Sequence, residues 1–281
     1  MRAHDHGLAM TEVLIAMALS LLVALAAASL LHASNGDFLH NGANSRIDDS
    51  GRFALAIISQ SLRQAGYPGE PGAGAGAAPG SPLAIEGRDA ASVASNADGL
   101  GAALPAINGS DVLAIRYAPT AIAGASGGGA MLNCAGFPAD AGEWAWSIFY
   151  IAQASDGIAE LRCKYKGENG WGSDAVVRGV DAFHVLYGVD TDNPRDHIPN
   201  LYLTASAMNA RDASLWRRVA SVRIALLLHG ERGSRSGNLL SSYELFPGAD
   251  PGAHIDEASL PEPMRHLARR LFTASVALRN P

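Results

Sequence analysis

The stretch "GLAMTEVLIAMALSLLVALAAASLL", residues 7–31, is almost wholly apolar but carries one carboxylate, Glu12, near its start. Between residues 13 and 31 only two serines are polar. A helix over these residues is about 28 Å long, close to the hydrocarbon thickness of a bilayer. An ionised carboxylate in hydrocarbon costs about 2.5–3.5 kcal/mol even on lenient scales. The stretch therefore predicts a membrane-spanning helix over about 13–31, and Glu12 needs a reason of its own.

An ordinary secretory signal peptide is the alternative for this segment, but its apolar region usually has only about 7–15 residues. The leader "MRAHDHG" contains a single arginine, Arg2, so the charge that orients a membrane span is weak. The residues "AAAS" at 26–29 make a possible but poor cleavage site. A membrane anchor fits the segment better than a secretion signal.

The start of the segment resembles a type IV prepilin signal. Gly7 is followed by an apolar residue, Leu8, and Glu12 stands five positions after the glycine, ahead of the long apolar helix. The resemblance implies that residues 1–7 are a leader peptide, that a prepilin peptidase cuts between Gly7 and Leu8, and that the new N-terminal residue, Leu8, is methylated. Leu8 stands where the family usually has Phe.

Glu12 gains a physical role from this resemblance. Cleavage leaves a cationic amine at Leu8, and a carboxylate in the first turn of a helix is favoured by the helix dipole. When subunits pack side by side, Glu12 of one subunit can pair with the amine of its neighbour, since either charge left unpaired would cost several kcal/mol. Glu12 is therefore expected to set the register between subunits, as a lone polar residue does in a coiled coil.

The helix is expected to run over 8–66 and to leave the membrane in its second half. Gly36, Gly42 and Gly51 each weaken it by up to about 1 kcal/mol, which favours local bending or melting. Gly66 with Tyr67-Pro68 is a stop signal. Spacings of three and four residues predict one apolar stripe on this half, made of Phe53, Ile57, Ile58, Leu62 and Ala65.

Residues 67–110 are expected to be a Gly/Ala/Pro-rich linker and loops, since 68–82 read "PGEPGAGAGAAPGSP" without periodicity. No motif stands out over 68–140. Residues 124–128 formally match the G-x-S-x-G of hydrolases. No strand precedes and no helix follows this motif, so its context gives no catalytic serine.

Residues 111–281 predict a β-rich globular domain. Residues 143–151 and 158–165 flank Asp156-Gly157, which indicates a hairpin. Along 221–226 apolar residues alternate with others, which places the apolar set on one face. We therefore expect an α+β fold in which the long N-terminal helix packs on an antiparallel sheet. The further predicted strands are 111–118, 175–190, 215–230 and 269–280.

Charge and residue spacing argue against several kinds of function. The net charge of −6 gives no footprint for nucleic acid. The nine histidines show no metal-binding spacing, and no catalytic, phosphate-binding or cofactor-binding constellation is recognisable, so an enzyme is not expected.

Asp190, Asp192 and Asp196 loosely resemble a calcium loop, but Pro194 stands at a ligand position and the glycine is missing, which favours a solvated acidic turn. Arg265, Arg269 and Arg270 are expected on a solvated face or at a subunit contact.

Cys134 and Cys163 are the only two cysteines. They can form one disulfide if the domain is exported, or remain two buried thiols. Their spacing does not favour a metal site.

Several later phrases resemble minor pilins of the PilW family: "SGRFALAIISQSLRQAGY" (50–67), "VVRGVDAFHVLYGVDTD" (176–192), "WRRVASVRIALLL" (216–228) and "FTASVALRN" (272–280). The resemblance implies a subunit of a type IV pilus tip or priming complex that helps to initiate pilus assembly, and thus serves twitching motility and adhesion. The implied partners are other minor pilins, the major pilin, a large tip adhesin and the prepilin peptidase. The implied location is the inner membrane, with the C-terminal domain in the periplasm, and then the pilus.

Two alternatives remain open from the sequence. One is a minor pseudopilin of a type II secretion system. The other is a membrane-anchored surface module that binds through the loops of 68–140.

Overall fold

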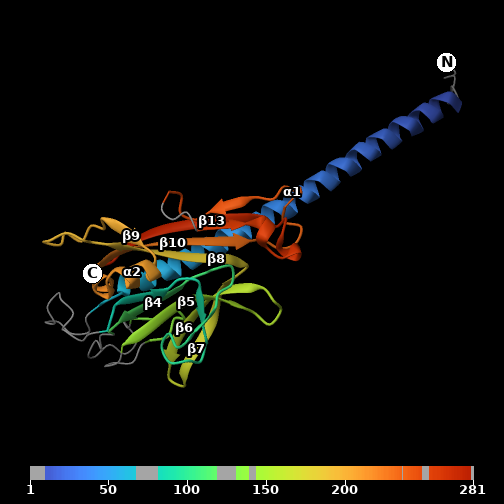
Figure 1. The fold of residues 1–281 in the computed structure, drawn as a ribbon. Coiled ribbons are helices and arrows are strands. Elements are labelled where there is room, and N and C mark those ends of the chain that lie inside the picture. The colour runs from blue at the N-terminus through green and yellow to red at the C-terminus, as the bar shows by residue number, and fades with distance from the viewer. Residues whose placement is uncertain are drawn as a thin grey trace, which may run out of the picture.

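A long helix projects from a β-rich body in the computed structural model (Figure 1). Helix α1 (Met10–Gln64) has 55 residues, and its first half stands clear of the body. The structure describes residues 10–67, 82–118, 131–138, 144–235, 237–248 and 253–279. The fold is α+β with antiparallel sheets, as the sequence predicts.

The first sheet has five antiparallel strands in the order β1-β4-β5-β6-β7. Its outer face is covered by the small hairpin of β2 and β3. Lys164 of β6 fastens this hairpin, because its buried ammonium group donates to the carbonyl oxygens of Ala94 (2.8 Å) and Gly99 (2.6 Å). The strands are β1 (Ile85–Arg88), β2 (Ala91–Val93), β3 (Ala103–Pro105), β4 (Val112–Tyr117), β5 (Ala145–Gln153), β6 (Ala159–Gly167) and β7 (Gly170–Arg178).

The second sheet has four antiparallel strands in the order β13-β10-β8-β9. Its strands are β8 (Val180–Val189), β9 (Leu201–Leu203), β10 (Val219–His229) and β13 (Arg269–Ala277). Helix α2 (Ala205–Arg211) and the 3-10 helix Ala213–Arg218 connect β9 to β10. The hairpin of β11 (Ser242–Glu244) and β12 (His254–Asp256) and the 3-10 helices Glu257–Ser259 and Glu262–Met264 lie between β10 and β13.

The main core lies where the second half of α1 meets both sheets. Ile58 and Leu62 of the helix are fully buried together with Phe149 of the first sheet and Ile224 of the second. The expected apolar stripe is partly wrong, since Phe53 is 54% exposed. The buried stripe runs along the neighbouring line of the helix, through Ile47, Ala54, Ile58, Leu62 and Ala65.

The second sheet is buried on both faces, where one apolar face was expected. Val222 and Ile224 of β10 face the main core, whereas Ala225 and Leu227 contact a second apolar cluster on the opposite side. The segment that follows β10 supplies that cluster with Leu245, Phe246, Ala253, Ile255 and Leu260. A single long strand over 175–190 was also wrong, because Gly179 with φ of +75° separates β7 from β8 and sends them into different sheets.

Residues 67–110 contain structure where linker and loops were expected. Strand β1 pairs with β4 along the edge of the first sheet, and Asp89, just after β1, accepts hydrogen bonds from the backbone N–H groups of Ala205 and Ser206 at the start of α2. Residues 68–81, the most Gly/Ala/Pro-rich part, and 119–130, with the G-x-S-x-G motif, lie outside the described residues.

Candidate functional site: the two halves of the long helix

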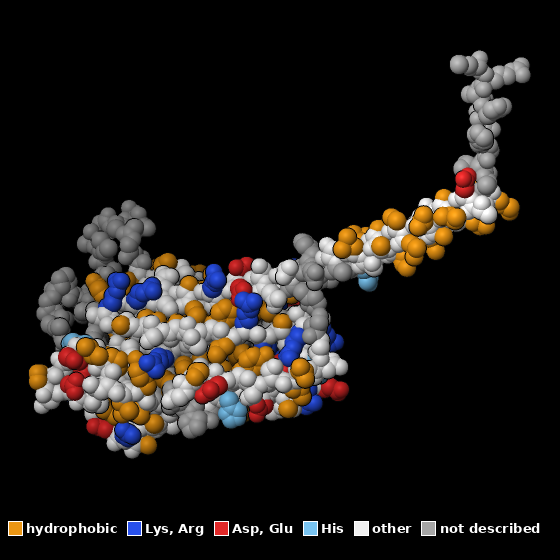
Figure 2. Space-filling view, turned by 90° about the horizontal axis from the view of Figure 1, so that it is seen from above, with side chains coloured by type: hydrophobic (Ala, Val, Ile, Leu, Met, Phe, Trp, Pro, Cys, Tyr) orange, Lys and Arg blue, Asp and Glu red, His pale blue; other side chains and the backbone are white. Residues whose placement is uncertain are grey.

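The first half of α1 has the dimensions and surface of a membrane span. Within Met10–His32, the most apolar stretch of 18 residues has a mean hydropathy of 2.6, and none of it is buried. The span is about 34 Å long at 1.5 Å per residue. Side chains around the whole circumference are exposed, from Met10 (83%) to Leu30 and Leu31 (73% each), and Figure 2 shows this apolar rod standing free of the body. Such a surface must be covered by lipid or by other apolar helices.

Glu12 lies in the first turn of α1 and is exposed. Val13, Ala16, Met17 and Ser20 lie on the same side of the helix as this carboxylate. The hydroxyl of Ser20 donates to the carbonyl oxygen of Ala16 (2.7 Å), so the helix satisfies that polar group internally. Gly7 and Leu8, the predicted cleavage and methylation positions, lie outside the described residues.

The second half of α1 is held by the second sheet at close range. Gly51 faces Phe272 of β13 so closely that a Cβ atom there would lie 2.4 Å from the ring. Asp48 pairs with Arg270 of β13, with 2.6 Å between Nη1 and the carboxylate. Gly51, which sequence propensity alone marks as a weak point, is therefore what lets the helix and the strand approach each other.

Cys134 and Cys163 are joined by a disulfide in the structure, with a Cα–Cα distance of 5.9 Å across 29 residues of sequence. Closing a loop of that length stabilises the fold by roughly 3–4 kcal/mol on the chain-entropy model. The bond ties the turn around Asn133 to the middle of β6. This turn and β7 border an open groove beside Phe53 and Ile57 of α1.

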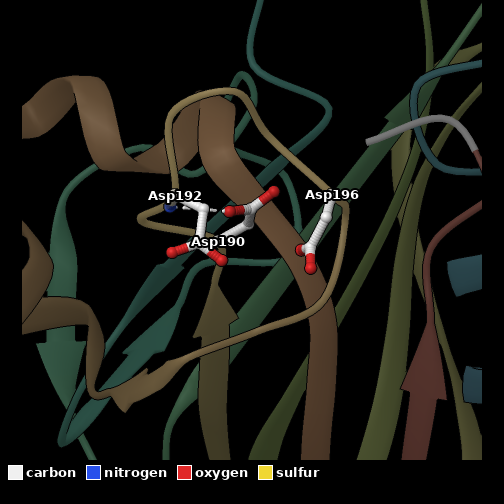
Figure 3. Close-up of side chains that lie close together, drawn as sticks. All are labelled: Asp190, Asp192 and Asp196. Carbon is white, nitrogen blue, oxygen red and sulfur yellow. Dashed lines mark hydrogen bonds between the residues drawn. The ribbon is translucent and has the colours of Figure 1, made fainter.

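The three aspartates after β8 come together, with one carboxylate oxygen from each within 4.8 Å of the others (Figure 3). Asp190 is buried, and its oxygens accept from the backbone N–H groups of Asp192 (2.9 Å) and His197 (2.8 Å). Burial raises the pKa of Asp190, but these two donors and Arg195 outweigh it, so the pKa lies below its ordinary value. The buried carboxylate thus stabilises the turn itself.

A buried ionic cluster escaped the sequence analysis. Arg269 was expected on a solvated face or at a subunit contact, yet its guanidinium is fully buried between Asp181 of β8 (2.7 Å) and Glu257 (2.8 Å). Glu257 also pairs with Arg235 (2.9 Å) and accepts from the backbone N–H of Ser241 (2.8 Å). The cluster holds the segment between β10 and β13, which covers the outer face of the second sheet, against that sheet. Asp181 and Arg269 are 88 positions apart, so no local pattern indicates their contact.

The chain therefore combines one exposed helix that is long and apolar enough to cross a membrane with a body of antiparallel sheets. Residues 148–280 match the family described as Type IV Pilus-assembly protein W, PilW. The resemblance to this family is therefore confirmed over the C-terminal region, which is related to pilus assembly and not to an enzyme. The family match suggests that this protein interacts with other pilus components. The match and the apolar helix together suggest membrane anchoring and association with the pilus.

Among solved structures, the type IV-like pilin TTHA1219 from Thermus thermophilus is similar, with a TM-score of 0.43 and 15% identity over 84% of this chain and 97% of that chain. No match was found among curated protein sequences.

Proposed function

We propose that this protein is a minor pilin of a type IV pilus, a subunit of the tip or priming complex that helps to initiate assembly. The observation that carries the proposal is the contrast within α1: an apolar half with an acidic first turn stands free of a body whose sequence matches PilW. The pilus-assembly family favours a pilus over a type II secretion system. The other minor pilins, the major pilin and a tip adhesin are the proposed partners.

The proposed mechanism uses the helix twice. In the inner membrane, with the body in the periplasm, α1 anchors the subunit after cleavage between Gly7 and Leu8 and methylation of Leu8. During assembly the same apolar surface leaves lipid and packs against helices of neighbouring subunits. Glu12 then pairs with the N-terminal amine of a neighbour, because a carboxylate inside an apolar bundle must be compensated. Only the correct axial stagger allows this pairing, so Glu12 sets the register.

The test is replacement of Glu12 in cells that depend on this subunit. We expect Glu12→Ala to remain in the membrane but to be lost from sheared pili, with twitching motility reduced. Thr11→Ala, one position away and also exposed, is the matched control and should assemble normally. Mass spectrometry of the membrane-bound protein should find a methylated Leu8 at the N-terminus. Normal pili and twitching with Glu12→Ala would contradict the register role, and an N-terminus near Ser29 would contradict prepilin processing.

A further inference from the structure

Arginines gather along the line where the second half of α1 lies against β13, in a chain whose net charge is −6. We call this line the α1–β13 seam. Its exposed or half-exposed charged residues are Asp48, Asp49, Arg52, Arg63, Arg270 and Arg279. Four positive charges therefore face two negative ones, and the seam is a basic strip on an acidic protein.

The helix and the strand bring these charges together along the body. Gly51 lies against Phe272, and Figure 1 shows β13 running along α1 to the end of the body where the helix stops. Arg63 follows Gly51 by twelve residues, about 18 Å of helix. The same length of strand takes five to six residues at about 3.3 Å each, which leads from Phe272 to 277–278. Arg63 is therefore close to the level of Arg279.

Three of these arginines make no ion pair within the part of the chain that the structure describes. Asp48 pairs with Arg270 and not with Arg52, which follows it by one turn of the helix. Arg63 lies in the last turn of α1, where the helix dipole favours a cation. Arg52 in the middle of the helix gains nothing from the dipole. The charges of Arg52, Arg63 and Arg279 are thus available to a partner.

The exposed side of the helix at the seam continues the side that carries Glu12. About 36 residues make ten turns, so Arg52 lies in line with Ala16 of the first half. Phe53 lies in line with Met17 for the same reason. Ala16 and Met17 are on the same side of the helix as Glu12. A subunit whose helix packs parallel to α1 on this side consequently has its own body beside the seam.

The side chains between the arginines are typical of a protein interface. Phe53 is 54% exposed, and Ala56 and Gln60 are exposed on the same side of the helix. Aromatic residues and arginine are enriched where proteins meet. A bilayer that holds the apolar span is distant, because Arg63 follows His32 by 31 residues, about 46 Å of helix.

We propose that the α1–β13 seam binds an acidic surface on the body of the neighbouring pilus subunit that packs along the Glu12 side of α1. The inference rests on the proposed function and adds a second contact to it. Glu12 sets the axial register at the base of the helix, whereas the seam selects which subunit occupies this side. Complementary charges favour the correct partner, and like charges reject others.

The test places the photo-crosslinking amino acid p-benzoylphenylalanine at Ala56, in piliated cells that depend on this subunit. We expect ultraviolet light to join the protein to another pilus subunit, and mass spectrometry to locate position 56 beside acidic residues of that subunit. Arg52→Glu combined with Arg63→Glu should lower the crosslinked fraction about tenfold, because attraction becomes repulsion. Arg211→Glu, also exposed in the last turn of a helix, is the matched control and should crosslink like the wild type.

A reciprocal exchange then tests the charges directly. Lysines in place of the partner's acidic residues at the crosslinked site should restore crosslinking to the double variant. Thermal unfolding of the purified double variant checks that its fold is intact, and the wild-type crosslink does not depend on that variant.

The outcomes separate the inference from the function on which it rests. A joined peptide without acidic residues, a product that contains lipid or DNA, or equal crosslinking by the wild type and the folded double variant would overturn the inference. If sheared pili contain the protein but position 56 joins no subunit, the seam contact is wrong and the proposed function stands. If the protein is absent from pili, the proposed function fails and the inference with it.

Discussion

The two halves of α1 belong to one continuous helix but have opposite surroundings. From Met10 to His32 the helix touches no other part of the described body and is apolar on all sides, whereas from Ile47 onward one line of residues is buried against two sheets. The first half can therefore be stabilised only by lipid or by other chains, and the second half is part of the domain core. Substitutions in the second half should therefore change the stability of the body, whereas substitutions in the first half should change only the proposed assembly.

The largest expected difference concerns two glutamates, Glu12 in the exposed half and Glu257 in the body. Replacing the fully buried Glu257 by Gln removes the carboxylate that pairs with both Arg235 and Arg269 and leaves Arg269 with Asp181 as its counter-charge. Losing one partner of a buried ion pair costs about 3–5 kcal/mol. Chemical denaturation of the full chain in detergent measures this loss. Glu12→Gln should leave the free energy of unfolding unchanged, because its carboxylate is exposed outside the core.

The same glutamate predicts a dependence on pH. Burial raises the pKa of Glu257, but the N–H of Ser241 and the guanidinium groups of Arg269 and Arg235 outweigh it, so the pKa in the folded state lies below the ordinary 4.5. A depressed carboxyl pKa contributes stability that is present above the unfolded value and is lost as the pH falls through the folded value. The free energy of unfolding should therefore fall below about pH 4.5 in the wild type and depend less on pH in Glu257→Gln. Parallel curves for the two proteins would contradict this assignment.

A pair of leucines gives the next comparison. Leu62→Ala removes a fully buried side chain from the interface of α1 with both sheets, for which about 2–5 kcal/mol is expected. Leu22→Ala, at a side chain that is 61% exposed, should change the stability of the body by less than about 0.5 kcal/mol. Thermal unfolding followed by the near-ultraviolet signal of the tryptophans, which all lie in the body, reports this difference. Equal losses would mean that the halves do not fold independently.

Sequence reasoning succeeded where a pattern is local. The apolar run and the helix continuing to Gln64 follow from composition and spacing, and β5 and β6 follow from two apolar runs around Asp156-Gly157. It failed where neighbours come from far along the chain. β1 has four residues in an Ala/Gly-rich region and exists because β4 offers it an edge. Phe53 points outward, whereas its neighbour Ala54 is fully buried.

The residues of the candidate site show the same contrast between local patterns and long-range contacts. Glu12 is conspicuous because it interrupts an apolar run, whereas Arg269 looks like any arginine in "HLARR" and becomes buried only through Asp181 and Glu257. One missed signal was present. Ala225 and Leu227 are apolar on the face of β10 that alternation reserves for polar residues, which indicates that something covers that face.

Two glycines of α1, Gly42 and Gly51, are expected to respond in opposite ways to replacement by Ala. Gly51→Ala places a Cβ atom 2.4 Å from the ring of Phe272, and the repacking costs about 1–3 kcal/mol, more than the roughly 1 kcal/mol gained in helix propensity. Gly42→Ala has open space around it and should gain that helix propensity without a clash. Denaturation should thus give opposite signs for the two variants, and Phe272→Leu should relieve part of the loss in Gly51→Ala. Stabilisation by Gly51→Ala alone would show that β13 yields easily to the helix.

The smallest expected effect lies near the boundary between the halves, where Arg270 pairs with Asp48. The two side chains are 48% and 28% exposed, so solvent screens their attraction, and Arg270→Ala should cost less than about 1 kcal/mol despite the 2.6 Å distance. Raising the salt to about 1 M, where the Debye length is only about 3 Å, should reduce the difference between wild type and variant further. Denaturation at low and high salt measures both. A loss of several kcal/mol that salt does not diminish would mean that the ion pair, and not the apolar line from Ile47 to Leu62, holds the helix to the body.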